Sequence, residues 1–206
     1  MIKLFREKGI EDAFNVVLGN VQKSINNLSN QEILKGDLEQ MAENILKKHQ
    51  INELEIDLEK RDVKTTMNEI LGSWFPLGTD VRRDQYYSCA KVNYTFQIKS
   101  GNIELLSVHP KTVSFNHQID AEFNENQFTI GYQTRYANSN LSEQVKQEVK
   151  QKMRLIIQSS RQVIDAINKE VRDFNSNLNI QIQGELEKKR EELQRRKDQD
   201  DDLNKL

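Results

Sequence analysis

Histidine and cysteine are scarce in this sequence, which limits the chemistry that its side chains can perform. The 206 residues include three histidines, His49, His109 and His117, and one cysteine, Cys89. A zinc site needs three or four converging ligands, usually with some at short spacing, and these residues lack that spacing. A nucleophilic Cys89 would need a histidine base oriented by a carboxylate, which the sequence does not place. We therefore predict no metal site and no catalytic residue among them.

One combination of acidic, amide and basic residues is compatible with metal-dependent hydrolysis. Asp80 or Asp84 precedes Gln97-Ile98-Lys99, which stands at the end of a predicted strand. This pattern loosely resembles the Asp and Gln-x-Lys site of restriction-type endonucleases, where the acid and the amide bind Mg²⁺ and the lysine helps to position a water. The resemblance implies a small Mg²⁺-dependent nuclease. The surrounding strands are predicted to be antiparallel and without helical crossovers, which disfavours that fold.

Four carboxylates alternate with apolar residues in a stretch that predicts a strand. Glu53, Glu55, Asp57 and Glu59 would project about 7 Å apart from one face of such a strand. The sequence identifies no complementary cluster to pair with them. We predict a solvated strand face rather than catalytic acids.

Two groups of basic residues are candidates for contact with nucleic acid. The formal net charge of the chain is -2, so binding would have to be local. One group lies close to Tyr86-Tyr87, the other lies on a predicted helix, and glutamates neutralise much of the second. The candidate residues are Arg82, Arg83, Lys188, Lys189, Arg195 and Arg196. Because both phosphate-binding glycine motifs are absent from the sequence, we predict no nucleotide cofactor.

An apolar stripe with helical spacing dominates the C-terminal third of the sequence. Its members recur every three or four residues from Leu141 to Leu186. A helix from Ser142 to Phe174 would be about 50 Å long, whereas a nine-residue strand spans about 30 Å. Part of the stripe must therefore extend past any sheet that the helix covers. Its partner there would be either the N-terminal helices or a second subunit.

We assign a candidate interaction surface to the second half of this stripe. The predicted contact residues are Ile156, Val163, Ile164, Ile167, Val171, Phe174, Leu178 and Ile182. A coiled-coil-like homodimer is the simplest assembly that would cover them.

The whole pattern predicts an α+β fold built from three consecutive segments. Residues 1–50 form a helical pair, residues 51–139 form an antiparallel sheet of about five strands, and residues 140–206 form a long helix or helices with a charged, frayed tail. The result would be a single compact unit with a helical arm.

Local signals place the boundaries of these elements. Ser29 and Glu32 have the spacing of a capping box at the start of the second helix, which would contain Gly36. A long connection is predicted from Arg61 to Arg83. Hairpins are predicted at Ser100-Gly101 and at Asn124-Glu125-Asn126.

Several short motifs resemble a module found at the N-terminal side of uncharacterised bacterial proteins whose C-terminal part is a nuclease-like or other effector domain. The resembling stretches are Phe75-Pro76-Leu77-Gly78-Thr79, His109-Pro110 with Thr112 and Phe115, and Asp173-Phe174-Asn175 with Leu178 and Arg190. Lys111 and Val113 around Thr112 and the acidic tail depart from the pattern. Some proteins of this kind are suspected of roles in phage defence. The resemblance implies a regulatory or assembly module and carries over no catalytic residue.

We therefore expect a non-enzymatic sensor, adaptor or scaffold that oligomerises, most simply as a dimer, or binds a protein effector. The alternatives are the small nuclease and a nucleic-acid-binding protein that uses the basic C-terminal helix. No stretch of 18 consecutive apolar residues occurs, and the N-terminus lacks the apolar run of a signal peptide. We expect a soluble, cytoplasmic protein with no membrane contact.

Overall fold

The computed structural model describes residues 2–124 and 126–205 and confirms the α+β prediction. The chain forms two compact units: unit 1 contains Met1–Lys8 and Leu54–Ala166, and unit 2 contains Gly9–Glu53 and Ile167–Leu206. This division differs from the three consecutive predicted segments, because each unit combines stretches that are distant in the sequence. None of the described helices has an apolar stretch that could span a membrane.

Unit 1 is built on a five-stranded antiparallel sheet in the order β1-β6-β7-β4-β3. The strands are β1 (Ile2–Lys3), β3 (Glu55–Leu71), β4 (Tyr86–Ser100), β6 (Asp120–Asn124) and β7 (Gln127–Gln133). Two further short strands are β2 (Lys8–Gly9) and β5 (Val108–His109). The central strand β4 pairs with the long edge strand β3 on one side and with β7 on the other. The hairpin of β6 and β7 was predicted from the sequence. Glu125 of its turn lies outside the described residues.

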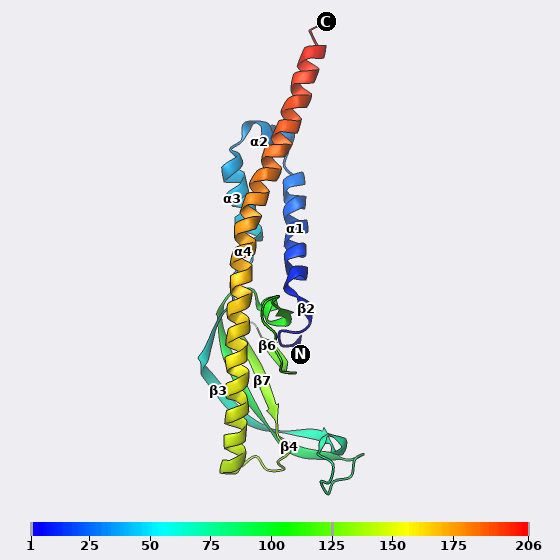
Figure 1. The fold of residues 1–206 in the computed structure, drawn as a ribbon, viewed down its shortest axis with the longest axis vertical. Helices are drawn as coiled ribbons and strands as arrows, with labels where there is room; N and C mark the ends of the chain where they lie inside the picture. Colours follow the sequence, from blue (N-terminus) through cyan, green and yellow to red (C-terminus); the bar gives the residue numbers. More distant parts are fainter. Residues whose placement is uncertain (1, 125, 206) are drawn as a thin grey trace. The chain divides into compact units, whose positions relative to one another are not determined.

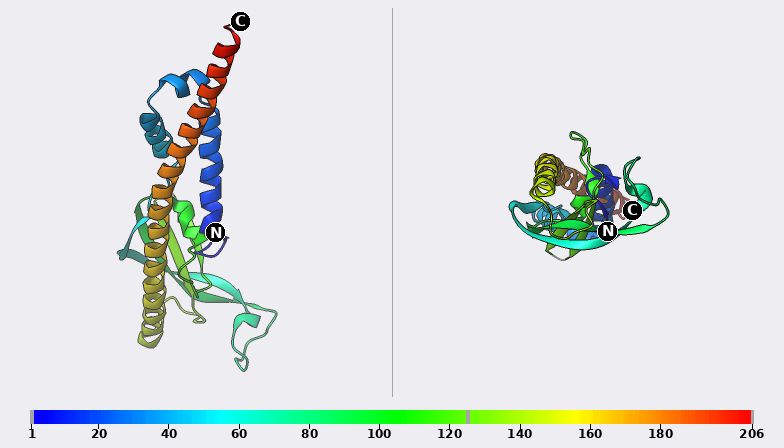
Figure 2. Two further views of the ribbon diagram at one scale, coloured as in Figure 1. Left: turned by 45° about the horizontal axis from the view of Figure 1, so that its top comes forward. Right: turned by 90° about the horizontal axis from the view of Figure 1, so that it is seen from below.

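One face of this sheet is apolar and is covered by the first part of α4 (Glu143–Leu203) (Figure 1). Figure 2, on the right, looks along this helix and shows the sheet curving beneath it. Alternate residues of β4 are buried on the covered face: Ala90, Val92, Tyr94, Phe96 and Ile98. Val145, Val149 and Met153 of α4 are buried as well. The predicted apolar and polar faces, and the helical cover, are therefore present.

Three details of the sheet differ from the sequence-based expectation. β3 continues from Glu55 to Leu71, so much of the predicted connection from Arg61 to Arg83 is strand. Ile103–Ser107 forms a 3₁₀ helix (η2) after Gly101, whose φ is 104°, in place of the second strand of a hairpin. β1, at the other edge, comes from a region predicted to be helical. Short or exposed strands leave little periodicity to detect, which explains the misses at β3 and β1.

Unit 2 is helical and contains α1 (Ile10–Asn26), α2 (Asn30–Lys35), α3 (Leu38–His49) and the C-terminal part of α4. The Ser29/Glu32 capping box is present at α2, with Ser29 N–H donating to Glu32 at 2.7 Å. The predicted second helix is broken at Gly36. A side chain there would meet Glu32 O at 2.5 Å, and Asp37 caps a new helix.

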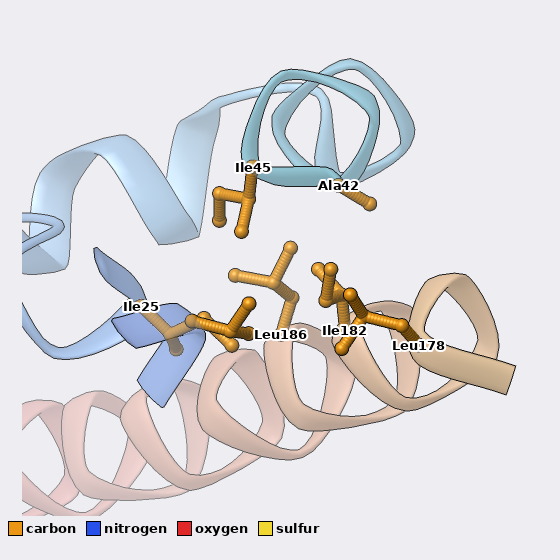
Figure 3. Packing of buried hydrophobic residues seen from close by; sticks show 7 residues of the cluster. Ile25, Ala42, Ile45, Leu178, Ile182 and Leu186 are labelled. Atoms are coloured by element: carbon orange, nitrogen blue, oxygen red, sulfur yellow. The ribbon is translucent and has the colours of Figure 1, made fainter. Parts of the chain in front are cut away.

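The core of unit 2 is closed by the apolar stripe of α4 (Figure 3). Leu178, Ile182 and Leu186 pack with Val21 and Ile25 of α1 and with Ala42 and Ile45 of α3. Phe174 stacks on Phe14, with ring centroids 4.1 Å apart. The N-terminal helices are thus the cover that the surplus length of α4 required.

This packing changes the interpretation of the candidate interaction surface. Ile156, Val163, Ile164, Ile167, Val171, Leu178 and Ile182 are all buried inside the single chain. They form the cores of the two units and offer no exposed surface to a second subunit.

α4 runs without a break through residues 175–179, which include three asparagines. Asn175, a poor helix-interior residue, donates from Nδ2 to Ile51 O at 2.9 Å and accepts from Ile51 N–H at 3.1 Å. The side chain thus satisfies backbone groups just after α3. The acidic stretch Asp198–Asp202 is also helical, where a frayed tail was predicted.

We predict that Ile182→Ala lowers the free energy of unfolding of unit 2 by about 2 to 4 kcal/mol, because it leaves a cavity in a fully buried position. Chemical denaturation followed by helical circular dichroism measures this change. Ile180→Ala is the matched control, since Ile180 is 68% exposed on the same helix. Equal effects of the two substitutions would contradict the described core.

Candidate functional site

The residues of the nuclease hypothesis lie at opposite ends of β4. Asp80 and Asp84 precede the first residue of the strand, whereas Gln97 and Lys99 are near its last. From Tyr86 to Gln97 the strand covers about 35 Å. Lys99 Nζ lies 3.4 Å from Glu55 Oε1. The structure does not bring the four residues together, and the residues that it describes contain no group of three or more metal-ligating side chains.

The histidines and the cysteine have separate local environments. His49 Nε2 lies 2.7 Å from Ser24 Oγ in unit 2, and His117 Nε2 lies 3.1 Å from Ser159 Oγ in unit 1. His109 is exposed on β5. Cys89 is buried beside Ile70 and Phe75, and this burial raises the pKa of its thiol. Both serine–histidine contacts place a hydroxyl beside a possible base, but Cys89 contacts none of the three histidines within the described residues.

The four carboxylates predicted to line a solvated face have separate partners. Glu53 pairs with Arg172, Glu55 with Lys99, and Glu59 with Arg161. Asp57 accepts from the backbone N–H groups of Lys60 and Glu59, and the bond from Lys60 is the main reason that the pKa of Asp57 is lowered. The carboxylates are arranged as individual ion pairs and a turn.

Several of the candidate nucleic-acid residues hold backbone carbonyls instead. Arg83 Nη1 donates to the carbonyls of Ser73 and Phe75, at 3.1 and 2.8 Å, and so fixes the connection between β3 and β4. Lys189 Nζ donates to Ile25 O at 2.9 Å near the end of α1. Arg195 Nε donates to Glu191 O within α4 at 3.4 Å, while Arg82, Lys188 and Arg196 are exposed.

A groove in unit 1, between α4 and the strands β3 and β4, is a concave feature lined by both apolar and charged residues. It consists of two adjoining cavities of about 430 and 210 Å³ that share Tyr94 and Lys150. Apolar side chains form its floor, and basic side chains line it. We call this feature the α4 groove; its floor includes Val63, Val92, Tyr94, Val149, Met153 and Ile157, and its basic residues are Arg61, Lys146, Lys150 and Arg154.

The basic side of the α4 groove follows one flank of the helix. Lys146, Lys150 and Arg154 are four residues apart, so they rise by about 6 Å per step along α4. Lys146 is paired with Glu143, at 2.7 Å. Within the described part of the chain, Lys150 and Arg154 form no salt bridge of this kind. The flank towards β7 differs, because there Glu148 accepts from the Tyr132 hydroxyl at 3.1 Å.

Arg61 reaches this groove through an irregularity in β3. Asp57 stands opposite Gln97, but Arg61 stands opposite Phe96, so three additional residues of β3 lie between these pairs. Because an odd shift moves the following side chains to the other face of a sheet, Arg61 and Val63 lie on the side of α4. Burial raises the pKa of the Tyr94 hydroxyl in the groove, and the charge of Arg61 partly offsets that rise.

The uncovered face of the sheet is a weaker candidate. Its polar side chains are largely occupied by one another: Asn93 Nδ2 donates to Thr66 Oγ1 at 3.1 Å, and the hydroxyls of Thr95 and Thr129 are 2.9 Å apart. Lys91 lies 3.9 Å from Glu122. The α4 groove, by contrast, combines an apolar floor with Lys150 and Arg154, which form no salt bridge within the described residues.

Sequence reasoning missed the α4 groove. The four-residue spacing of Lys146, Lys150 and Arg154 was visible in the sequence. Nothing in the sequence indicated which strand would lie opposite this flank of the helix. Comparisons with protein families, with curated proteins and with solved structures found no match. The resemblance to N-terminal modules of bacterial effector proteins stays a prediction.

We predict that Arg83→Ala destabilises unit 1 by about 1 to 2 kcal/mol, because it removes the donor that holds the carbonyls of the β3–β4 connection. Thermal unfolding of the two variants Arg83→Ala and Arg82→Ala tests this. The Arg82 side chain is exposed, so its loss should change stability by less than about 0.5 kcal/mol. A larger effect at Arg82 would contradict the assignment.

We also predict a pH dependence of unit 2 that requires His49. Burial, and then the charge of Lys48, lower the pKa of His49 in the folded protein. The unfolded chain therefore binds more protons than the folded one, and stability falls as the pH drops below about 6.5. Denaturation from pH 8 to pH 5 should show a smaller loss for His49→Gln. His109→Gln, at an exposed position, is the control and should retain the loss of the unchanged protein.

Proposed function

We propose that this chain is a non-enzymatic adaptor or sensor module that binds an extended acidic segment of a partner protein in the α4 groove. The observation that carries this proposal is the row of cations along one flank of α4, above an apolar floor. Cations beside a hydrophobic depression favour a ligand that has both carboxylates and apolar groups.

The spacing of the cations supports an extended peptide. Alternate side chains of an extended chain lie about 6.6 Å apart, close to the step of about 6 Å between Lys146, Lys150 and Arg154. Acidic residues at alternate positions could therefore face successive cations. The intervening side chains would be free to contact the floor at Val63 and Val92.

The proposal includes self-association as a dimer, for which the stripe from Ile156 to Ile182 is no longer the candidate surface. It also includes a cytoplasmic location, since a lone buried thiol such as that of Cys89 suits a reducing compartment. A role in bacterial antiviral defence is the setting that the sequence resemblance suggests for such a module.

A direct binding measurement tests the proposal. A short fluorescein-labelled peptide that alternates glutamate with valine should raise its anisotropy when the protein is added, and added salt should weaken the binding. Lys150→Glu should lower the affinity about ten-fold or more, because it replaces an attraction by a repulsion.

Lys152→Glu is the matched control, since it makes the same change of charge about 200° around the same helix. Lys152 is exposed and does not line the groove. Equal losses at Lys150 and Lys152, or no binding at all, would contradict the proposal. Tighter binding of a single-stranded oligonucleotide, lost with Lys150→Glu, would replace the acidic peptide by nucleic acid as the ligand.

A further inference from the structure

The outer edge of β3 is a second surface with unused binding capacity. β3 ends the strand order β1-β6-β7-β4-β3, so only β4 pairs with it. No backbone hydrogen bond from another described segment reaches Arg61–Glu69 on the outer side. A long free edge presents a row of backbone donors and acceptors that an added strand can pair with.

Two large apolar side chains are exposed along this edge strand. Val63 is 54% exposed and Met67 is 42% exposed, and both lie on the face of the sheet that carries α4. Exposed apolar residues on one face of an unpaired strand are costly for an isolated subunit and favourable next to an incoming strand.

We propose that two copies of this chain pair antiparallel through β3, with Thr65 facing Thr65 of the second copy across a two-fold axis. In a continuous sheet with such symmetry the two-fold axis is perpendicular to the sheet. Each residue of one copy is therefore paired with a residue of the other copy whose side chain lies on the same face of the sheet. A register centred on Thr65 places Arg61 opposite Glu69 and Val63 opposite Met67. Each pair occurs twice by symmetry, which is the pattern of an isologous interface.

The sequence of the edge favours this register over its neighbours. Centring on Lys64 would place Glu59 opposite Glu69, and centring on Thr66 would place Val63 opposite Glu69. Centring on Val63 would bring the irregular stretch between Asp57 and Arg61 into the paired region. Only the register centred on Thr65 joins opposite charges at both ends with apolar pairs between them, in an uninterrupted stretch from Arg61 to Glu69.

We assign the strand that pairs with β3 to a second copy of this chain rather than to an unrelated protein. The reason is that Arg61 and Glu69 of the same edge are complementary in charge when two copies pair antiparallel. Pairing over Arg61–Glu69 would form about eight to ten backbone hydrogen bonds. This interface shares Arg61, Val63 and Thr65 with the lining of the α4 groove. It specifies the dimer on which part of the proposed function rests, and it does not depend on peptide binding.

Charge reversal tests the ends of the register. Light scattering or sedimentation at micromolar to submillimolar concentration should show a dimer of the 24.1 kDa chain. Glu69→Arg, which leaves the groove residues unchanged, should weaken the dimer about ten-fold, and so should Arg61→Glu. The double variant Arg61→Glu/Glu69→Arg should restore the original dissociation constant to within about three-fold.

A disulfide tests the centre of the register. In a Cys89→Ser background, Thr65→Cys should form an intermolecular disulfide on mild oxidation, since opposed Cα atoms lie about 4.5 to 5.5 Å apart. Val63→Cys is the control; its two copies would be separated by about 13 Å along the strands and should not link.

A monomer at every concentration would overturn the proposal and make the charges of β3 a protection against edge pairing. Cross-linking through Val63→Cys rather than Thr65→Cys would also overturn it, as would a dimer that is insensitive to both charge reversals. Loss of peptide binding in Lys150→Glu with an unchanged dimer would separate this interface from the α4 groove.

Discussion

The buried face of α4 supplies one side of two separate hydrophobic cores, and most other features of the protein depend on it. In unit 1, Val145, Val149 and Met153 are buried with the apolar face of the sheet; in unit 2, Leu178, Ile182 and Leu186 pack with α1 and α3. A core-facing stripe that continues over so many turns leaves only the flanks of the helix for other roles. On one flank, Lys150 and Arg154 border the α4 groove. On the C-terminal part, Lys189 and Arg190 hold carbonyls of the N-terminal helices.

Elements that bury one regular face were predictable from the sequence, and those without such a face were not. β4 alternates between buried and half-buried residues, and α4 repeats every three or four residues, so both gave clear periods. β3 between Arg61 and Glu69 is exposed along most of its length, and only its pairing with β4 makes it a strand. β1 has two residues and depends on β6, which lies far along the chain.

The candidate site could be predicted only in part for the same reason. Three of its cations lie on one predicted helix, but Arg61 joins them through the irregularity in β3, which changes the face that the strand presents to α4. No single-sequence pattern reports such a shift. Conversely, Arg83 and Lys189 are basic residues of the type that binds anionic ligands. In the structure both donate hydrogen bonds to backbone carbonyls. Residue type suggested binding, while the position of each residue in the fold decides whether its charge is available.

The interleaved composition of the two units has a consequence for how the protein is made. Unit 2 begins with α1 and α3, yet its core is complete only when Leu178 to Leu186 have been added. At usual rates of synthesis, roughly ten seconds separate the completion of α3 from the arrival of those residues. During that interval Val21, Ile25 and Ile45 have no partner from α4. The nascent N-terminal helices therefore expose these apolar side chains until α4 is made, and slow translation of the sheet region would prolong that exposure.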